Sequence, residues 1–244
     1  GFIEYQEVKD TYKEPYKGEM YHFKGRTLDT VVTPNHRFLT INRNGKYEYH
    51  TAEELANGDD FKHYKIVRRS NGIKESKKRE KITIGNNTFD FDDFVYFLGF
   101  YLSEGWVKKR KDRPNNYSIH IAQNEGETAD KIRKSIESLG FTVQENHRKR
   151  KNSNHIVFSF YNKDLANYLT KFGTSYDKYI DQDIIKKMDS KSAMLFIESF
   201  TLGDGRGKLN EKYIKSDVFS TSESLIDDII YVASIAGIGS KKTY

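Results

Sequence analysis

The stretch FLGFYLSEGW (residues 97–106) is a run of large apolar side chains with small residues at Gly99 and Ser103, and it ends on Glu104 before a glycine. Because residues four apart share one face of an α-helix, Gly99 and Ser103 form a thin stripe on an apolar helix. The C-terminal end of a helix is a poor place for a carboxylate, since that end carries a partial negative charge. The stretch therefore predicts a buried helix that approaches a partner closely and presents an acid.

A second copy of the pattern occurs 100 residues later, in FIESFTLGDG (196–205). The equivalent positions are Ser199 for Gly99, Gly203 for Ser103 and Asp204 for Glu104. The similarity continues downstream, where residues 121–140 align with residues 218–237 at an offset of 97. A period of this length indicates two pseudo-symmetric halves and not a solenoid.

Two such helices, packed about a pseudo-twofold axis, would bring Glu104 and Asp204 together at their ends. Small residues let the backbones approach, by the logic of small-xxx-small helix pairs. Neighbouring carboxylates repel each other, and a divalent cation such as Mg²⁺, which prefers oxygen ligands, relieves that repulsion. Paired acids that share metal ions suit hydrolysis of one phosphodiester on each strand of a duplex. The alternative is two ordinary solvated acids that precede glycine caps.

Composition agrees with an anionic partner, because the 244 residues carry a formal net charge of +6. The basic residues cluster at 74–81, 108–113 and 147–151, although any one cluster could be a solvated loop. The chain has no cysteine, which excludes disulfides and thiolate sites. No apolar run is long enough to cross a bilayer and no signal peptide opens the chain, so we expect an intracellular protein, cytoplasmic or nucleoid-associated. The start GFIEYQEV lacks a Met, and we expect a piece of a longer protein.

The hydrophobic pattern divides the chain into four parts. Residues 1–67 alternate in short runs that turn residues separate, which is typical of an all-β unit. Within it, Thr51 and Glu54 form a capping box that predicts one short helix. Residues 68–88 are polar and basic, and we interpret them as a linker with room for one strand. Helical and strand patterns then alternate in two units with these bounds: 89–189 and 190–244. The helices are predicted at 90–105, 127–140, 162–173, 181–188 and from 190, and the strands at 116–123, 141–145 and 155–160.

The segments FLGFYLSEG (97–105) and IESFTLGDG (197–205) resemble the two motifs of the LAGLIDADG homing endonucleases in their single-chain, two-repeat form. The resemblance implies an α+β fold with a pseudo-twofold pair of αββαββα repeats, whose sheets form a saddle over the DNA major groove. The second repeat would be incomplete, without its last two strands and helix. A single chain with two repeats implies a monomer bound to double-stranded DNA.

The resemblance also implies roles for individual residues. The last acid of each motif would bind the catalytic Mg²⁺ ions, and these acids are Glu104 and Asp204. A lysine that the family often keeps in a K-x-I-P stretch corresponds to Lys178, with Asp181 in place of the proline. The polar residue that positions active-site water corresponds to Gln123, with Ser220 as its second-half counterpart. Side chains expected to contact DNA are Lys108, Lys109, Arg110, Lys111 and Arg113 in a hairpin, Tyr117, Ser118 and His120 in a strand, and Arg148, Lys149, Arg150 and Lys151 in a loop.

Residues 1–67 resemble part of the Hint fold of inteins. The segment TVVTPNHRFLT (30–40) is similar to the intein T-x-x-H block, with Thr33 and His36. The His of that block protonates a leaving amide nitrogen, a task suited to imidazole. The chain lacks a splicing nucleophile at its start and a His-Asn pair at its end, so as written it would not splice. The combined prediction is an intein-type, site-specific endonuclease that makes metal-dependent double-strand breaks.

Three alternatives stay open. The first is a non-cleaving protein of the same fold, a maturase or DNA-binding regulator. The second is a decayed nuclease attached to a splicing domain, which the two retained acids disfavour. The third is a carbohydrate- or protein-binding β domain joined to a helical domain, which leaves the internal repeat unexplained.

Overall fold

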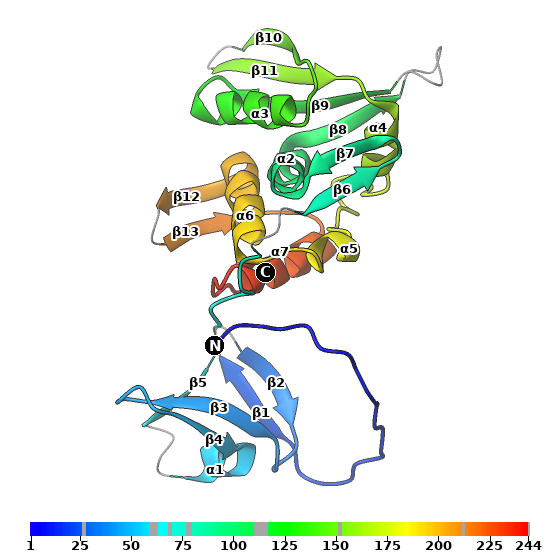
Figure 1. The fold of residues 1–244 in the computed structure, drawn as a ribbon. Coiled ribbons are helices and arrows are strands. Elements are labelled where there is room, and N and C mark those ends of the chain that lie inside the picture. The colour runs from blue at the N-terminus through cyan, green and yellow to red at the C-terminus, as the bar shows by residue number, and fades with distance from the viewer. Residues whose placement is uncertain are drawn as a thin grey trace.

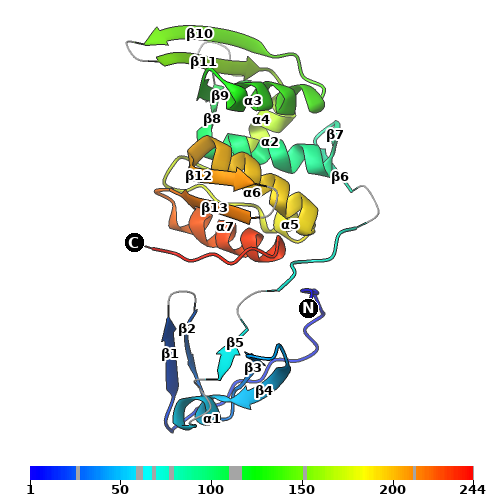
Figure 2. The same cartoon turned by 90° about the vertical axis from the view of Figure 1, so that its left-hand side faces the viewer.

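In the computed structural model the chain forms a small β lobe and a larger α+β lobe, which Figures 1 and 2 show one below the other. The structure describes these residues: 1–25, 28–58, 63–67, 70–76, 80–109, 117–150, 153–210 and 213–243. It describes the backbone alone at 150, 153, 207–210 and 213–215. No helix in these ranges is long and apolar enough to cross a membrane.

The small lobe is an all-β unit with one short helix. A hairpin of β1 (Tyr21–Gly25) and β2 (Leu28–Val32) accompanies a three-stranded antiparallel sheet in the order β4-β3-β5. Its members are β3 (Arg37–Asn42), β4 (Tyr47–Thr51) and β5 (Tyr64–Ile66). Helix α1 (Ala52–Asn57) starts at the predicted capping box, which is confirmed, with Thr51 and Glu54 each bonding the other's backbone N–H. The core is small and is formed by Phe38, Ala52 and Leu55.

The pattern of residues 68–88 predicts a linker with room for one strand, and the structure instead has two strands from residue 81 onward. Strands β6 (Lys81–Ile84) and β7 (Asn87–Asp90) form an antiparallel hairpin with Gly85 at φ +57° in its turn. The alternation in KITI buries Ile82 and Ile84 in the large core, and Phe89 is buried opposite them. The hairpin therefore belongs to the large lobe. Alternate side chains of a strand point to the same face, so Ile82 and Ile84 both reach the large core while their neighbours face solvent.

The first repeat has the implied αββαββα order. Its elements are α2 (Phe91–Glu104), β8 (Gly105–Lys109), β9 (Tyr117–Asn124), α3 (Glu127–Ser138), β10 (Gln144–Arg150), β11 (Ser153–Phe160) and α4 (Lys163–Thr170). The strands form one antiparallel sheet in the order β10-β11-β9-β8, and α3 lies beneath β10 and β11 in both side views (Figures 1 and 2). Residues 147–150, interpreted as a loop, are instead the second half of β10, which pairs with β11 as far as Arg150. Basic residues tolerate an edge strand, because their side chains project into water.

The second repeat begins after α5 (Gln182–Ile185). Its described elements are α6 (Ser190–Asp204), β12 (Gly205–Asn210), β13 (Tyr213–Val218) and α7 (Glu223–Ile235). This αββα order reproduces the first four elements of the first repeat, with β12 and β13 as an antiparallel hairpin. The mixed α+β fold is confirmed.

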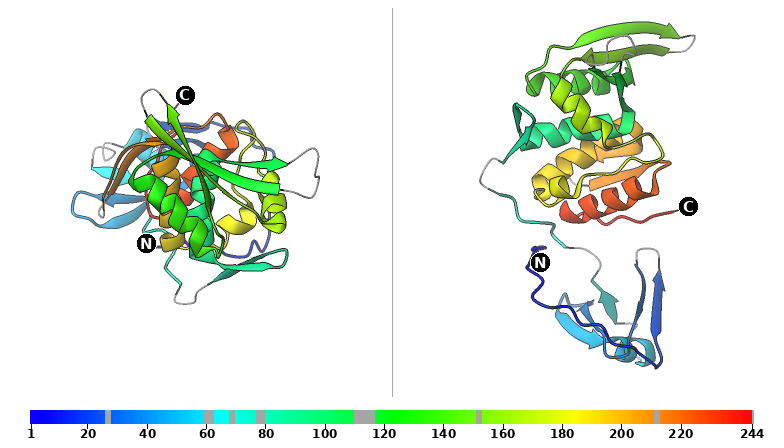
Figure 3. Two further views of the ribbon diagram at one scale, coloured as in Figure 1. Left: turned by 90° about the horizontal axis from the view of Figure 1, so that it is seen from above. Right: turned by 90° about the vertical axis from the view of Figure 1, so that its right-hand side faces the viewer.

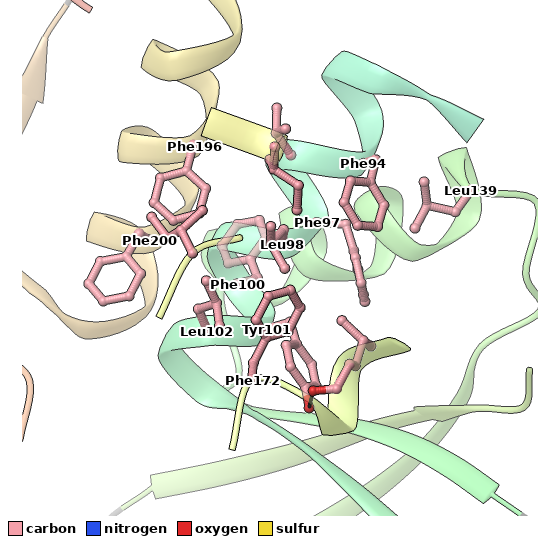
Figure 4. Close-up of a cluster of buried hydrophobic side chains, with 14 of the residues drawn as sticks. Phe94, Phe97, Leu98, Phe100, Tyr101, Leu102, Leu139, Phe172, Phe196 and Phe200 are labelled. Atoms are coloured by element: carbon pink, nitrogen blue, oxygen red, sulfur yellow. Dashed lines mark hydrogen bonds between the residues drawn. The ribbon is translucent and has the colours of Figure 1, made fainter. Parts of the chain in front are cut away.

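One hydrophobic core joins both repeats. Helix α2 is buried on most of its circumference, and its phenylalanines pack with Phe196 and Phe200 of α6 (Figure 4). The right-hand view of Figure 3 shows both helices in the middle of the large lobe, below β10 and β11. Full burial of each such ring contributes roughly 1.5–3 kcal/mol to folding. The contact between α2 and α6 therefore fixes the positions of the two helix ends relative to each other.

Candidate active site and nucleic-acid interface

The small residues of α2 and α6 meet where the two helices cross. A Cβ on Gly99 would overlap Ser199 Oγ and lie 2.8 Å from the carbonyl oxygen of Phe196. In the reverse sense, a Cβ on Gly203 would overlap Ser103 Oγ and lie 2.7 Å from Ser103 Cβ. Each glycine thus receives the serine of the other helix, which is the relation expected about a pseudo-twofold axis.

Burial of the two serines is compatible with hydrogen bonding. Ser103 Oγ donates to the carbonyl oxygen of Phe100 and Ser199 Oγ to that of Phe196, both at 3.0 Å. Each hydroxyl is therefore satisfied within its own helix, which removes the cost of burying an unpaired polar group. The contact stays tight without a bond between the helices.

Both helices end on the acid and turn directly into a strand. Gly105 and Gly205 cap the two ends, and each backbone N–H donates to the carbonyl oxygen four residues earlier. A Cβ on Gly105 would lie 2.6 Å from the carbonyl oxygen of Tyr101, so the turn has no room for a side chain. The acids Glu104 and Asp204 are thereby fixed at the last helical position on each side of the crossing.

The ionisation of Glu104 depends on the charge of Asp204. Burial raises the pKa of Glu104, and the negative charge of Asp204 raises it further, while Lys178 opposes both effects. Burial also raises the pKa of Asp204, again against Lys178. The acids are therefore close enough to interact, and a cation between them would relieve the unfavourable charge.

Lys178 lies at the same place, although it is far away in sequence. Its Nζ donates to the carbonyl oxygen of Leu102 at 2.8 Å and to that of Gly105 at 3.4 Å, both at the end of α2. Burial lowers the pKa of Lys178, whereas Asp204 and Glu104 raise it. The side chain thus caps the negative end of α2 and faces both acids.

The segment that carries Lys178 is held by the N-cap of α7 and by a residue inside that helix. Ser222 Oγ donates to the carbonyl oxygen of Lys178 at 2.6 Å, and Asp228 Oδ2 accepts from the N–H of Ile180 at 2.8 Å. Asp181, which stands where the family has proline, caps α5 and pairs with Lys171 at 2.6 Å. Asp181 therefore caps the start of α5 in place of the proline, and Lys178 keeps its position at the end of α2.

Gln123 is half-buried in β9, beyond the pair formed by Gly105 and Ile121. Its Oε1 accepts from the N–H of Asn124 at 2.8 Å. Its counterpart Ser220 accepts from the N–H of Ser222 at 3.0 Å, at the start of α7. The register places Gln123 beside the end of α2, whereas Ser220 serves the local turn.

The donor set fits a metal such as Mg²⁺. Within the part of the chain that the structure describes, no three His, Asp or Glu side chains gather into a metal site. Two carboxylates with no third protein ligand suit Mg²⁺, which keeps several waters and binds through one or two carboxylates together with substrate phosphates.

The four-stranded sheet has one face toward the helices and an outer face toward solvent. Ile119, Ile121, Ile156 and Phe158 are buried beneath it, so residues of the opposite parity point outward. The outer face, defined by the pairing of described strand residues, is formed by Trp106, Lys108, Ser118, His120, Ala122, Asn124, Gln144, Asn146, Arg148, His155, Val157 and Ser159. None of these is acidic, and most carry donors and acceptors of the kind that read base edges, although Ser118 and Val157 are covered by their neighbours.

Only some of the predicted DNA-binding residues lie on the outer face. Lys108, Ser118, His120 and Arg148 lie on it, and the backbone of Arg150 continues the same parity. The interpretation of Tyr117, Lys109 and Lys149 as groove-facing is not supported: Tyr117 packs against the core, and Lys109 Nζ lies 5.3 Å from its ring. Lys149 alternates with Arg148 and has the parity of the helix side. Arg110, Lys111, Arg113 and Lys151 lie outside the described residues.

Trp106 is an outer-face residue that sequence reasoning missed. Its ring stacks on that of His120, its cross-strand partner, with centroids 5.2 Å apart and planes 9° apart. His120 Nε2 lies 2.7 Å from Ser118 Oγ. The position two residues after Glu104 was the available signal, because β8 follows α2 without a loop.

The proposed splicing block is a turn in the small lobe. The N–H of His36 donates to the carbonyl oxygen of Thr33 at 3.1 Å, and Thr33 Oγ1 donates to Asn35 Oδ1 at 2.7 Å. The ring of His36 is exposed and contacts Phe38 edge-on, with centroids 4.8 Å apart. The role of Thr33 and His36 stays a prediction.

A comparison with known families identifies the first repeat. Residues 93–188 match the model of the LAGLIDADG-like domain. This part of the chain is therefore a LAGLIDADG-like domain. The match begins in α2 and ends after α5, so it includes Glu104, Gln123 and Lys178 but not Asp204.

Proteins similar to this chain include large proteins of several kinds. It is 25% identical over 263 residues to an ATP-dependent Clp protease proteolytic subunit of Chlamydomonas moewusii, covering 97% of the chain and 24% of the relative. It is 29% identical over 161 residues to the DNA-directed RNA polymerase subunit Rpo1C of Methanocaldococcus jannaschii, covering 66% of the chain and 18% of the relative. The chain thus spans about a quarter or less of these relatives.

Among solved structures, the chain is similar to homing endonucleases bound to DNA. I-DmoI in complex with DNA and Mn matches with a TM-score of 0.40 and 14% identity, over 59% of this chain and 76% of that one. I-WcaI bound to its DNA recognition sequence matches with a TM-score of 0.42 and 14% identity, over 60% of this chain and 68% of that one.

Proposed function

We propose that this chain is an intein-type, site-specific homing endonuclease that makes double-strand breaks in DNA with Mg²⁺. The observation that supports the proposal most is the cluster of Glu104, Asp204 and Lys178 at the crossing of α2 and α6. One acid from each pseudo-symmetric half suits a substrate with two antiparallel strands, each with one phosphodiester to be cut.

Each residue of the cluster has a distinct task in the proposed reaction. Glu104 and Asp204 hold the metal ions, whose chemistry when bound is to polarise phosphate oxygens and acidify water. Lys178 is fixed at the end of α2 by its bond to Leu102 and presents a positive charge where negative charge develops on the phosphate. Gln123 orients water through its amide.

The outer face of the sheet supplies binding in this proposal. Lys108 and Arg148 attract the phosphates, a contribution that depends on salt and not on sequence. Asn124, Gln144 and Asn146 offer amides to base edges, which is the chemistry that distinguishes base pairs in the major groove. The absence of acids among the described outer-face residues spares the DNA a repulsive surface.

The relatives support the proposed insertion in host proteins. A protease subunit and an RNA polymerase subunit have little in common, yet the same chain matches 24% of one and 18% of the other. An intein carried within unrelated hosts would produce this distribution. Residues 1–67, with Thr33 and His36, are proposed as the remnant of its splicing domain.

Cleavage of a plasmid library with a randomised duplex insert tests the proposal. With Mg²⁺ the wild-type chain is expected to linearise plasmids of one related set of sequences, identified by sequencing the ends. Asp204→Asn is expected to bind the same sequences in a filter-binding assay without cutting them. A wild-type chain that selects sequences but cuts none with Mg²⁺ or Mn²⁺ would be a non-cleaving binding protein of maturase or regulator type, which overturns the nuclease.

A further inference from the structure

Trp106 is the single tryptophan of the chain and is not used by the metal site or the splicing block. It lies on the outer face two residues after Glu104 and is 42% exposed, although its ring is the largest apolar group in the sheet. A stack on His120 holds it there, with planes 9° apart. An exposed, immobilised tryptophan is typical of a contact surface, because aromatic side chains are enriched where one partner is buried against another.

The imidazole behind Trp106 is itself fixed. Ser118 Oγ lies 2.7 Å from His120 Nε2 along the same strand. Burial lowers the pKa of His120, and the charge of Lys108 lowers it further, so both effects favour the uncharged ring. The indole rests on a side chain that is itself held in place, and it therefore loses little conformational freedom when it meets a ligand.

We propose that Trp106 is a specificity-determining residue that packs against base edges of the target duplex, beside the phosphate on which Glu104 acts, and favours thymine there. The inference rests on the proposed function. The occupant is duplex DNA because the outer face carries Lys108 and Arg148 and no acid among its described residues. Thymine is favoured because its methyl is the apolar group that base pairs present in the major groove.

The second half differs at the equivalent position. Arg206 follows Asp204 by the same two residues and pairs across the hairpin with Asp217, opposite in parity to Val218, which packs against the core. Arginine reads guanine through its O6 and N7 atoms. The two half-sites are therefore expected to differ next to the cut, with thymine beside Trp106 and guanine beside Arg206.

Intrinsic fluorescence tests the contact directly, because tryptophan emission, excited selectively over the tyrosines, comes from Trp106 alone. A fluorescein-labelled duplex of mixed sequence is titrated at low salt with Ca²⁺, with anisotropy and tryptophan emission followed together. The expected result is a change in emission that parallels the anisotropy, with loss of acrylamide quenching at saturation. Binding by anisotropy with unchanged emission and quenching overturns the role of Trp106 and leaves the nuclease standing. No binding at all overturns both.

Variants test the base preference on sites selected from the plasmid library. Trp106→Ala is expected to weaken binding on the order of tenfold and to lose the thymine preference. Trp106→Phe is expected to keep part of both, and replacement of that thymine by deoxyuridine should weaken wild-type binding but not that of Trp106→Ala. Tyr161→Ala, at a 56% exposed aromatic after β11, is the matched control and should bind as wild type. An unchanged base preference in Trp106→Ala overturns the proposal.

Discussion

Gly99 and Ser199 are packed so closely between α2 and α6 that a Cβ on Gly99 would overlap the serine hydroxyl oxygen. One helical turn away, Gly203 of α6 packs in the same way against Ser103 of α2. Because Glu104 and Asp204 follow this contact directly, the distance between the helices sets the distance between the carboxylates. The small residues are therefore part of the active-site geometry and not only of the core.

Gly99→Ala is expected to destabilise the protein more than Gly203→Ala. The added methyl at position 99 meets backbone atoms of Phe196 at 2.8 Å and Phe200 at 2.9 Å, which cannot move without shifting α6. At position 203 the neighbour is the side chain of Ser103, which has more freedom to move. We expect a loss of about 1–3 kcal/mol for Gly99→Ala in urea unfolding. Ser103→Gly should rescue Gly203→Ala, and equal losses at the two glycines would contradict this account.

The two acids are expected to lower the stability of the metal-free protein at neutral pH. A carboxyl whose pKa is raised on folding binds its proton more tightly in the folded state, so stability falls as pH rises through that range. Glu104→Gln and Asp204→Asn should therefore each raise the melting temperature in EDTA. The corresponding gain in the free energy of unfolding should be less than about 1 kcal/mol for each variant. The gain should vanish below the usual range of carboxyl pKa values. A destabilised variant at neutral pH would show that the acids stabilise the fold.

Mg²⁺ is expected to reverse this order. A ligand that binds only the folded state stabilises it by about 2.7 kcal/mol when its concentration is a hundred times Kd. The wild-type chain should gain melting temperature with added Mg²⁺, and Glu104→Gln and Asp204→Asn should gain less. Equal gains in all three proteins would place the metal elsewhere.

Lys178→Met is expected to reduce cleavage on the order of a hundredfold, the usual effect of removing one group that stabilises developing negative charge. Loss of its cation also raises the pKa of Glu104 and Asp204 further, so the pH–rate profile should move to higher pH. Lys178→Arg should keep part of the activity and most of the profile. Lys186→Met, at an exposed lysine after α5, serves as the control for loss of a positive charge.

Salt dependence distinguishes the two faces of the sheet. Lys108→Ala combined with Arg148→Ala is expected to reduce the slope of log K against log salt by roughly two, because each phosphate contact contributes about 0.9. Lys109→Ala with Lys149→Ala removes the same charge from the helix side and should leave the slope nearly unchanged. Equal slopes for the two double variants would mean that the parity of the strands does not decide which cations contact DNA.

Much of the large lobe could be predicted from local signals. The apolar period and the acids of the first turn defined α2, and its repetition 100 residues later defined α6. One strand was expected in residues 68–88, but its pairing with β7 was missed, because β7 leads directly into α2 and has little alternation of its own. The strand ending at Arg150 was missed because a basic run reads as a loop when its pairing with β11 is unknown.

The sequence by itself determined the paired thin-sided helices and the acids at their ends, because each depends on residues within a few positions of one another. Only the tertiary structure decided which cations face outward, how Trp106 meets His120, and that Lys178 reaches the end of α2 from 76 residues away. Strand register and the approach of distant segments set these relations. A shift of one residue in pairing would turn every side chain of the sheet to the other face.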